Sequence, residues 1–206
     1  LIDGLAETDS DREKYLNIIL EESERLGKMV DEILQLSQIE AGSIQLKLSS
    51  FSIDAVVKRT IDKILPLAVK RDISIKFNKI DDDLLLCLAD ENRIKQILIN
   101  LLNNGIKHSY DHSNILISSY RLNDRIYICV RDFGEGIPEE DLPFIWDRFY
   151  TAGKSKDKSI GSTGLGLSII KSIINAHGCD ITVNSVKEEG TEFCFWLPSY
   201  TETNSN

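Results

Sequence analysis

Residues 100–108 read Asn-Leu-Leu-Asn-Asn-Gly-Ile-Lys-His, residues 132–136 read Asp-Phe-Gly-Glu-Gly, and residues 161–167 read Gly-Ser-Thr-Gly-Leu-Gly-Leu. The first segment predicts a helix that carries asparagines, the second an acidic turn rich in glycine, and the third a glycine-rich turn that opens another helix. Each segment alone is weak evidence for a function. Together, and in this order, they predict a nucleotide-binding pocket.

The asparagine segment has the chemistry of a metal and phosphate site. Asn100, Asn104 and Lys107 are spaced four and three residues apart, so they can share one face of a helix. The amide oxygen of Asn104 can coordinate Mg²⁺, which usually keeps several waters and takes substrate phosphates as ligands. Lys107 can bind a phosphate as a point charge. His108 has no second His or Cys at ligand spacing and is no metal site by itself. The alternative for this segment alone is a helix end with solvated polar residues.

The acidic turn predicts a contact with the base. Asp132 ends a predicted strand, where a fixed carboxylate can accept a hydrogen bond from an exocyclic amine and so select adenine. Gly134 and Gly136 would let the backbone approach a flat base closely. The alternative is that this Asp-x-Gly-x-Gly string is an ordinary turn.

The third segment predicts a contact with the phosphates. Gly161, Gly164 and Gly166 flank Thr163 just before a predicted helix, and free backbone N–H groups at a helix N-terminus bind phosphate. No Gly-Lys-Ser/Thr follows, which excludes the P-loop, and no strand leads directly into the turn, which excludes the dinucleotide fingerprint. A further turn, Gly190-Thr191, precedes a strand and is interpreted as structural.

The composition argues against a nucleic-acid partner. The 206 residues carry a net charge of −9, whereas a nucleic-acid surface needs a basic patch. Nucleotide phosphates must therefore meet local donors. The cysteines form no Cys-x-x-Cys pair, are not expected to bind metal, and are expected to be buried, reduced thiols of a cytosolic domain: Cys87, Cys129, Cys179 and Cys194.

The ends of the chain indicate a fragment. No apolar run reaches the roughly 18 residues that span a bilayer, and no signal peptide is recognisable. The chain opens at Leu1 without an initiator Met. We therefore expect a piece of a longer protein, in which any membrane segment lies elsewhere.

Residues 11–40 predict one long helix with an apolar seam, and Asp-Ser-Asp at 9–11 can cap its start. A lone helix would leave this seam in water. We therefore expect a two-helix hairpin that dimerises into a four-helix bundle, with residues 1–6 as the end of its first helix and 7–10 as its turn. The alternative is an N-terminal helix that packs on its own domain. The seam residues recur at alternating steps of three and four: Tyr15, Ile19, Leu26, Met29, Val30, Ile33, Ser37 and Glu40.

Beyond a break at Ala41-Gly42-Ser43, short strands mix with helices, as in an α+β sandwich with one mixed sheet and helices on one face. The long polar segment 133–162 is expected to be functional or mobile. The expected strands are 44–48, 73–77, 84–89, 115–121, 125–131, 180–185 and 192–197. The expected helices run from a cap at Ser52 to residue 71, from a cap at Asp90 through residue 108, and from 164 to 177, before Gly178. Their expected buried residues include Ile94, Ile97, Leu98, Leu101, Leu102, Leu165, Ile169, Ile170 and Ile173.

The three segments resemble the N box, G1 box and G2 box of the catalytic core of bacterial sensor histidine kinases. The resemblance covers residues 11–198. Phe-Ile-Trp-Asp-Arg-Phe-Tyr at 144–150 resembles the F box, and residues 21–26 and 34–37 resemble the second helix of the dimerisation hairpin. The resemblance implies the Bergerat-type ATP-binding fold, which is shared with type II topoisomerases, a heat-shock chaperone and mismatch-repair ATPases.

The resemblance implies ATP and Mg²⁺ as ligands and a role for each motif residue. Asn104 would hold Mg²⁺ with Asn100 nearby, and Lys107 would reach the phosphates. His108 takes a place where the family often has Tyr, which would let it stack on the nucleotide. Asp132 would bind the adenine amine. The remaining residues of the base pocket and the phosphate cradle would be Gly134, Gly136, Ile137, Thr163, Gly164, Leu165, Gly166 and Leu167.

The resemblance also implies a mobile ATP lid at residues 139–160. Phe149 and Tyr150 would anchor the lid against the hairpin, with Tyr150 beside the nucleotide. Many relatives have Arg directly after this Phe-Tyr pair, where this chain has Thr. Arg148 or Lys154 would therefore supply the positive charge near the γ-phosphate.

The main departure from the family concerns the phosphoacceptor. In the family, this histidine lies on the first hairpin helix and is followed by an acidic residue, Arg or Lys, and Pro. The chain has only His108, His112 and His177, and none has that context. We therefore expect that the fragment cannot autophosphorylate alone and that its incomplete hairpin dimerises poorly.

For the intact protein, the resemblance implies transfer of the ATP γ-phosphoryl group to a histidine and then to an aspartate on a response regulator receiver domain. The expected parts are a partial hairpin at 1–41, an ATP-binding domain at 43–199 and a tail at 200–206. This would be the cytoplasmic domain of a homodimeric parent protein in the bacterial cell membrane. The alternatives are a nucleotide-binding regulatory module without phosphotransfer and a serine kinase of the anti-sigma-factor type, which needs no hairpin.

Overall fold

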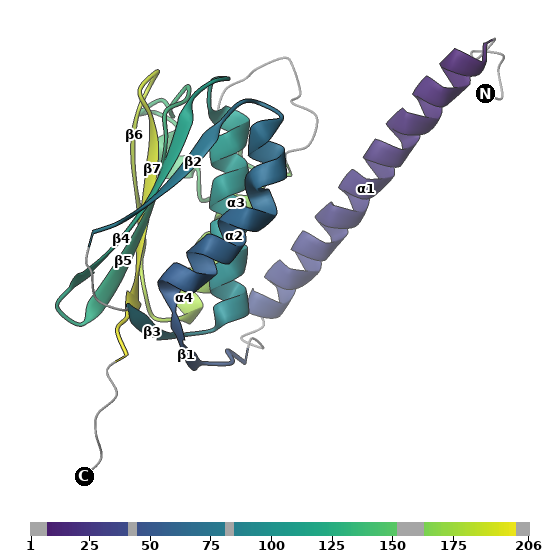
Figure 1. Ribbon diagram of the computed structural model, residues 1–206. Helices are drawn as coiled ribbons and strands as arrows, with labels where there is room; N and C mark the ends of the chain where they lie inside the picture. The colour runs from purple at the N-terminus through teal and green to yellow at the C-terminus, as the bar shows by residue number, and fades with distance from the viewer. Residues whose placement is uncertain (1–7, 41–44, 81–84, 152–162, 201–206) are drawn as a thin grey trace.

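The computed structural model describes residues 8–40, 45–80, 85–151 and 163–200, which form a long helix followed by a two-layer domain (Figure 1). Five strands form one mixed sheet in the order β2-β4-β5-β7-β6, and β1 pairs with β3 separately. β2 is parallel to β4, while the other neighbours in the large sheet are antiparallel. Helices α2, α3 and α4 cover one face of this sheet, which confirms the predicted α+β sandwich.

The elements follow one another in the order α1 (Asp9–Glu40), β1 (Ser49–Ser52), α2 (Ile53–Val69), β2 (Ser74–Lys79), β3 (Leu86–Ala89), α3 (Glu91–His108), β4 (Asn114–Leu122), β5 (Arg125–Asp132), the 3₁₀ helix η1 (Leu142–Phe144), α4 (Gly166–Ala176), β6 (Ile181–Val186) and β7 (Gly190–Pro198).

Two helix starts confirm the caps predicted from the sequence. The hydroxyl of Ser52 accepts the N–H of Ala55 at 3.4 Å at the start of α2. The carboxylate of Asp90 accepts two N–H groups from the first turn of α3. Asp90 also accepts the N–H of Lys47 at 3.0 Å, so the same carboxylate ties the segment before β1 to the start of α3.

The prediction of a strand at 44–48 is wrong. Residues 45–48 lie outside any strand, and β1 follows them, antiparallel to β3. The apolar alternation is misleading here because Leu48 is 54% exposed and the N–H of Lys47 bonds the side chain of Asp90 instead of a neighbouring strand. The other expected strands are present with shifted ends.

Thr8, which the sequence analysis did not single out, caps α1. Its hydroxyl oxygen accepts the N–H of Asp11 at 3.1 Å, and the Asp11 carboxylate accepts the Thr8 hydroxyl at 2.6 Å. This reciprocal cap starts the helix at Asp9, so the expected turn at 7–10 is wrong for its last two residues. The expected helix end at 1–6 lies outside the described residues.

α1 extends away from the domain (Figure 1), and its apolar seam lies in water. Its contact with the domain is centred on α4, where Met29 packs against the core. The described part of the domain does not cover the seam, and the hairpin stays a prediction. No helix in the described part of the chain, α1 included, is long and apolar enough to cross a bilayer. The exposed seam residues are Tyr15, Ile19, Leu26, Val30 and Ile33.

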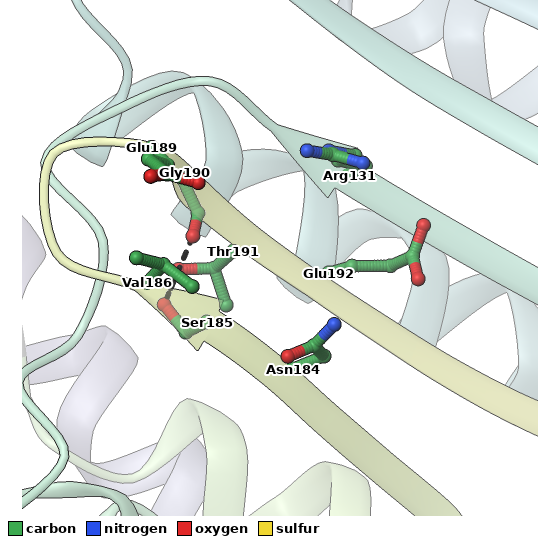
Figure 2. A pocket seen from close by; sticks show the side chains of 8 residues that line it. All are labelled: Arg131, Asn184, Ser185, Val186, Glu189, Gly190, Thr191 and Glu192. Atoms are coloured by element: carbon green, nitrogen blue, oxygen red, sulfur yellow. Dashed lines mark hydrogen bonds between the residues drawn. The ribbon is translucent and has the colours of Figure 1, made fainter.

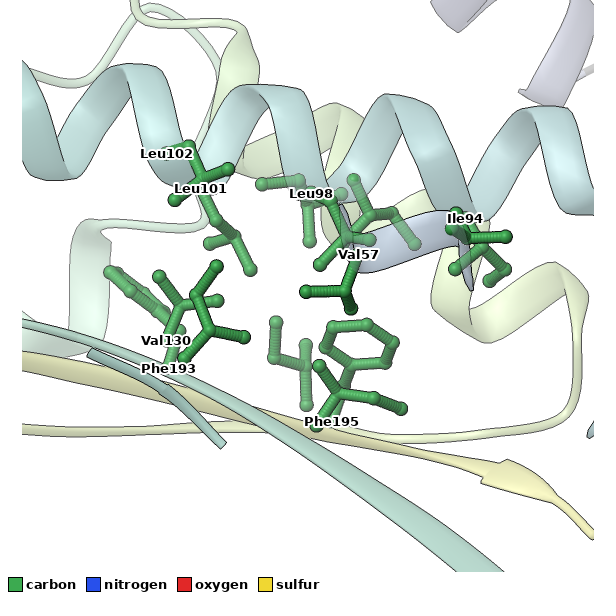
Figure 3. Packing of buried hydrophobic residues seen from close by; sticks show 14 of the residues in the cluster. Val57, Ile94, Leu98, Leu101, Leu102, Val130, Phe193 and Phe195 are labelled. Atoms are coloured by element: carbon green, nitrogen blue, oxygen red, sulfur yellow. The ribbon is translucent and has the colours of Figure 1, made fainter. Parts of the chain in front are cut away.

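The core lies between α3 and the sheet (Figure 3). Leu98 and Leu101 of α3 face Val130 and Phe195 of the sheet. Because interiors of this kind are close-packed, α3 is held firmly along its length. All the residues predicted to be buried on the last two helices are buried: Ile94, Ile97, Leu98, Leu101, Leu102, Leu165, Ile169, Ile170 and Ile173.

The prediction of reduced thiols holds for only two of the four cysteines. Cys87 and Cys179 are buried and free, and burial raises the pKa of Cys87 to about 12 and that of Cys179 to about 11. Cys129 and Cys194 are direct partners across β5 and β7 and form a disulfide, so the prediction is wrong for this pair. The register of β5 against β7 brings the two cysteines together. They are 65 residues apart in the sequence, so no local pattern predicts their contact.

Candidate nucleotide-binding site

α3 carries the asparagine segment to the end of β5. Gly105, in the last turns of α3, makes this approach possible. A Cβ at that position would lie 3.1 Å from Cδ1 of Ile115 and 3.7 Å from Cβ of Asp132. The first two motifs therefore meet in space. The residues predicted to bind metal and phosphate are all half-buried on this helix: Asn100, Asn104 and Lys107.

Asp132 is a buried carboxylate at the end of β5, only 7% exposed. Its Oδ1 accepts the N–H of Gly134 at 3.1 Å and the N–H of Thr191, on β7, at 3.2 Å. Its Oδ2 accepts no hydrogen bond from the residues that the structure describes. Burial raises the pKa of Asp132, against the lowering effect of the two N–H groups and of His108.

Backbone contacts join the end of α3 to the turn after Asp132. Ser109 forms an isolated antiparallel bridge with Gly134, and the N–H of Glu135 donates to the carbonyl of His108 at 3.2 Å. The His108 ring lies 2.6 Å from the Glu135 carboxylate through Nδ1. A Cβ at Gly134 would lie only 2.0 Å from the carbonyl oxygen of His108. The close approach at Gly134 is therefore to the end of α3, and the predicted approach to a base stays a prediction.

The hairpin of β6 and β7 supports the same turn from the other side. Gly136 has a φ of 65°, and a Cβ there would lie 2.1 Å from the carbonyl oxygen of Val186. The N–H of Ile137 donates to the hydroxyl of Ser185 at 2.8 Å. This hydroxyl lies 2.8 Å from that of Thr191, whose N–H binds the Asp132 carboxylate. A connected set of hydrogen bonds therefore fixes the turn.

The third motif opens α4. Backbone contacts with Phe149 hold this motif in place. Gly164 has a φ of 69°, and a Cβ there would lie 2.6 Å from the carbonyl carbon of Phe149. The N–H of Phe149 donates to the carbonyl of Gly164 at 3.0 Å. Leu165 is fully buried, so it can offer a ligand only its backbone, and its N–H donates to the hydroxyl of Thr163. Gly166 begins the helix, whose first N–H groups have no intrahelical acceptor.

Thr163 also contacts α1. Its hydroxyl donates to Oε2 of Glu32 at 2.5 Å, in a partly buried bond. Thr163 is one of the residues that the sequence predicts to cradle a nucleotide phosphate. α1 and the third motif are therefore directly connected.

Aromatic contacts fix part of the segment 144–150. The ring of Trp146 packs edge-on against Phe193 of β7, with centroids 5.9 Å apart. The ammonium of Lys171, on α4, lies 5.6 Å from the same ring. Trp146 thus links this segment to both the sheet and α4.

Residues 148–150, at the end of this segment, differ in part from the predicted contacts with the hairpin and the nucleotide. The hydroxyl of Tyr150 donates to Asp141 at 2.5 Å, and this bond raises the pKa of Tyr150 to about 12. Phe149 is 61% exposed, so its ring does not pack against the long helix as expected. Arg148 is also exposed. Lys154, predicted to lie near the γ-phosphate, is outside the described residues, as is Gly161.

A small hollow lies beside the β6–β7 turn (Figure 2). Arg131, Asn184 and Glu192 line it, together with Thr191. It adjoins Asp132, because Thr191 donates to the Asp132 carboxylate and Arg131 directly precedes Asp132 in the chain. No residue of α3 or of the third motif lines it, so we do not assign the nucleotide to it.

The donor set fits a Mg²⁺ ion that is held largely by its substrate. In the described ranges, no three His, Cys, Asp or Glu side chains gather in a way that could hold a metal ion. Mg²⁺ usually keeps waters and phosphate oxygens and needs only one or two protein ligands. The half-buried amide of Asn104 fits that role.

Sequence reasoning missed several residues that shape the site. Thr191 and Ser185 reach Asp132 and its turn only through the pairing of β6, β7 and β5. The interpretation of Gly190-Thr191 as a structural turn did not anticipate the bond to Asp132. Glu32 reaches Thr163 across 131 residues, and no local pattern predicts that contact.

The fold and the site define the class of protein. The chain belongs to the histidine kinase-, DNA gyrase B- and HSP90-like ATPase family, whose model matches residues 89–201 and so includes all three motifs. The model of the His Kinase A (phospho-acceptor) domain matches residues 1–42, which include α1. Both matches confirm the resemblance to the catalytic core of sensor histidine kinases.

Individual relatives agree with this class. The sensor histidine kinase WalK of Bacillus subtilis (strain 168) is 32% identical over 200 residues, which are 96% of this chain and 32% of WalK. Full-length ShkA in complex with AMPPNP matches 94% of this chain and 40% of its own, with a TM-score of 0.81 and 26% identity. The histidine kinase ThkA in complex with the response regulator protein TrrA matches 96% of this chain and 54% of its own, with a TM-score of 0.74 and 30% identity. The chain thus spans about a third of the length of the curated relative WalK.

Proposed function

We propose that this chain is the ATP-binding catalytic core of a sensor histidine kinase. Residues 43–199 form the nucleotide-binding domain, residues 1–41 form part of the dimerisation hairpin, and residues 200–206 are a tail. The observation that carries the proposal is the buried Asp132, which has one oxygen held by two N–H groups and the other available to a ligand. The AMPPNP bound by ShkA supports an adenine nucleotide as the ligand.

In this proposal, the end of β5 and its turn recognise the base. Oδ2 of Asp132 accepts a hydrogen bond from the exocyclic amine of adenine. Gly134, Gly136 and Ile137 form the wall against which the base lies, supported by the β6–β7 hairpin. His108, whose ring is held by the Glu135 carboxylate, stacks at the side of the nucleotide.

α3 and the start of α4 bind the phosphates in this proposal. Asn104 holds Mg²⁺ and Asn100 supports it, while Lys107 pairs with a phosphate oxygen. The hydroxyl of Thr163 and backbone N–H groups of residues 163–167 cradle the remaining oxygens at the N-terminus of α4. Mg²⁺, when bound, neutralises charge on the phosphates. Arg148 lies at the end of the F-box segment, from which it contributes positive charge.

The reaction breaks the bond between the γ-phosphorus and its bridging oxygen, and forms a bond from that phosphorus to a histidine nitrogen, with ADP as the leaving group. None of the three histidines lies within residues 1–42, which match the phospho-acceptor model. We infer that the accepting histidine belongs to another segment of the parent protein. The domain contributes positioning and charge stabilisation.

The partners follow from the exposed seam and from the relatives. The apolar seam of α1, which lies in water here, is completed by the other hairpin helices of a homodimer. ThkA was solved in complex with a response regulator, which supports a receiver domain as the final phosphoryl acceptor. Attachment of the parent protein to the bacterial cell membrane belongs to segments other than these residues.

Two experiments test the proposal. Calorimetric titration with ATP, with and without Mg²⁺, should show Mg²⁺-dependent binding that Asp132→Ala abolishes. Incubation with radiolabelled ATP and a separately supplied hairpin that contains the histidine should label that hairpin, and a receiver domain added next should remove the label. Folded protein that binds no ATP would refute the nucleotide site.

A regulatory module that binds nucleotide without transferring phosphate is the second candidate. The contact of Glu32 with Thr163 favours it, because α1 occupies a donor of the phosphate cradle. ATP binding without labelling of any supplied hairpin would select this candidate. The match of residues 1–42 to the phospho-acceptor model speaks against the serine kinase alternative.

A further inference from the structure

Arg71, in the turn after α2, holds the C-terminal end of α3. Its Nη1 donates to the carbonyl oxygens of Ile106 and Lys107, the latter at 2.9 Å, and its Nη2 donates to the carbonyl of Ser109 at 2.9 Å. The carboxylate of Asp111 accepts from Nε of the same guanidinium at 2.9 Å. One side chain therefore binds three carbonyl groups at the end of a single helix.

These bonds complete the hydrogen bonding of the helix end. The last four carbonyl groups of an α-helix have no intrahelical partner. In α3, Arg71 binds two of these four. The carbonyl of Gly105 accepts the N–H of Ser109 at 2.9 Å, and that of His108 accepts the N–H of Glu135 at 3.2 Å. Arg71 and the turn of the base pocket therefore hold the same helical turn from two elements.

We propose that Arg71 is a positioning residue for the nucleotide phosphates, because it fixes the last turn of α3, the turn that carries Lys107. This inference rests on the proposed function. Arg71 does not bind the phosphates itself, since its donors are used by the carbonyl groups and by a carboxylate. Asp132 is held directly by the N–H groups of Gly134 and Thr191, whereas Arg71 reaches this turn only indirectly, through Ser109. Loss of Arg71 therefore weakens phosphate binding more than adenine binding.

The chemistry of the guanidinium explains why the position needs arginine. Its planar fork presents several donors in fixed directions, so it can bind adjacent carbonyl groups at once. A cation at a helix C-terminus also interacts favourably with the helix dipole. Arg71→Lys keeps the charge but not the fork, so it retains only part of the function.

The test compares Arg71→Gln and Arg71→Lys with a matched control at the other end of α3. The control is Arg59→Gln, because Arg59 pairs with Glu91 in the first turn of α3, with 2.6 Å between the charged groups. Affinities for Mg²⁺-ATP and for adenosine are measured on the whole chain. We expect Arg71→Gln to weaken Mg²⁺-ATP binding about five-fold, and adenosine binding less than about two-fold. Arg71→Lys should lie between, and Arg59→Gln should match the wild type.

Hydrogen exchange provides a second readout. The amide of Glu135 donates to the carbonyl of His108. Its exchange rate should be higher in Arg71→Gln than in the wild type, and the same as the wild type in Arg59→Gln. A folded Arg71→Gln protein with wild-type affinity for both ligands overturns the inference, and so does an equal loss for both, which indicates a general structural role.

If Arg71→Gln does not fold, Arg71→Lys and Asp111→Asn test the same inference. Each should weaken Mg²⁺-ATP binding more than adenosine binding, with smaller effects than those expected for Arg71→Gln. Failure of the wild-type chain to bind ATP is a different result, because it refutes the proposed function on which the inference rests.

Discussion

The hydroxyl of Thr163 donates a 2.5 Å hydrogen bond to the carboxylate of Glu32, which lies 131 residues away in the sequence. The bond joins α1 to the turn that is proposed to cradle the phosphates. A carboxylate and a phosphate are both negative and both accept this donor, so they compete for it. In the proposed site, nucleotide binding and the contact with α1 are therefore expected to be coupled reciprocally.

Glu32→Gln should strengthen Mg²⁺-ATP binding about two- to five-fold, because it removes a negative charge beside the phosphates. Isothermal titration measures the change. Glu22→Gln is the matched control, since Glu22 lies on the same helix and pairs with Arg25 at 2.7 Å, away from Thr163. Unchanged or weaker binding by Glu32→Gln would contradict the competition.

Asp132→Asn should weaken ATP binding at least about ten-fold, because the amide can keep one oxygen for Gly134 and Thr191 but then places a donor where the adenine amine must donate. The same titration checks this. Wild-type affinity in this variant would show that Oδ2 of Asp132 does not recognise the base.

The same substitution should raise the stability of the protein at neutral pH. The pKa of Asp132 is raised in the folded state, chiefly by burial. The folded protein therefore binds more protons than the unfolded chain between the ordinary and the raised pKa. The contribution of this group to stability is largest at low pH and is lost as pH rises through the folded pKa. Thermal melts should show a higher Tm for Asp132→Asn at pH 7, with a difference that shrinks as the pH falls toward 4.

Gly134→Ala should destabilise the domain by about 1–3 kcal/mol, because the new Cβ would lie 2.0 Å from the backbone oxygen of His108. Denaturant unfolding measures the loss. Gly27→Ala is the control, because a Cβ there meets nothing within 4 Å and Ala favours a helix interior. A Gly134→Ala protein as stable as the control would show that the end of α3 and the turn can separate without cost.

Cys87 and Cys179 should resist alkylation in the folded protein. Burial raises their pKa values to about 12 and about 11, so the reactive thiolate is scarce at pH 8. Mass spectrometry after treatment with iodoacetamide should find both unmodified in buffer and modified in denaturant. Rapid labelling of Cys87 without denaturant would mean that the core around it opens readily.

Local patterns predicted the helices and two of their caps. The apolar spacing of α3 identified every buried residue that the sequence analysis named, because a helix buries one face with a fixed period. Ser52 and Asp90 were predictable as caps because the cap depends on residues two or three positions away. Thr8 was missed in favour of later residues, although it caps by the same rule.

Contacts between distant segments could not be predicted. The disulfide of Cys129 with Cys194 and the bond from Thr191 to Asp132 both depend on the register of β5 against β7. The register of a sheet is set by tertiary packing, which a single sequence does not display. The bonds of Arg71 depend in the same way on where α2 ends relative to α3.

α3 is fastened at both ends, by Asp90 at its start and by Arg71 and Glu135 at its finish. A ligand that binds along such a helix meets groups whose freedom was already lost during folding, so little further entropy is lost there on association. The hydroxyl of Thr163 is bonded to Glu32 of another helix, so in the proposed site it would have to exchange partners before it binds phosphate. The slow and adjustable step of nucleotide capture is therefore expected at the start of α4, and differences in on-rate among variants should trace to that end of the helix.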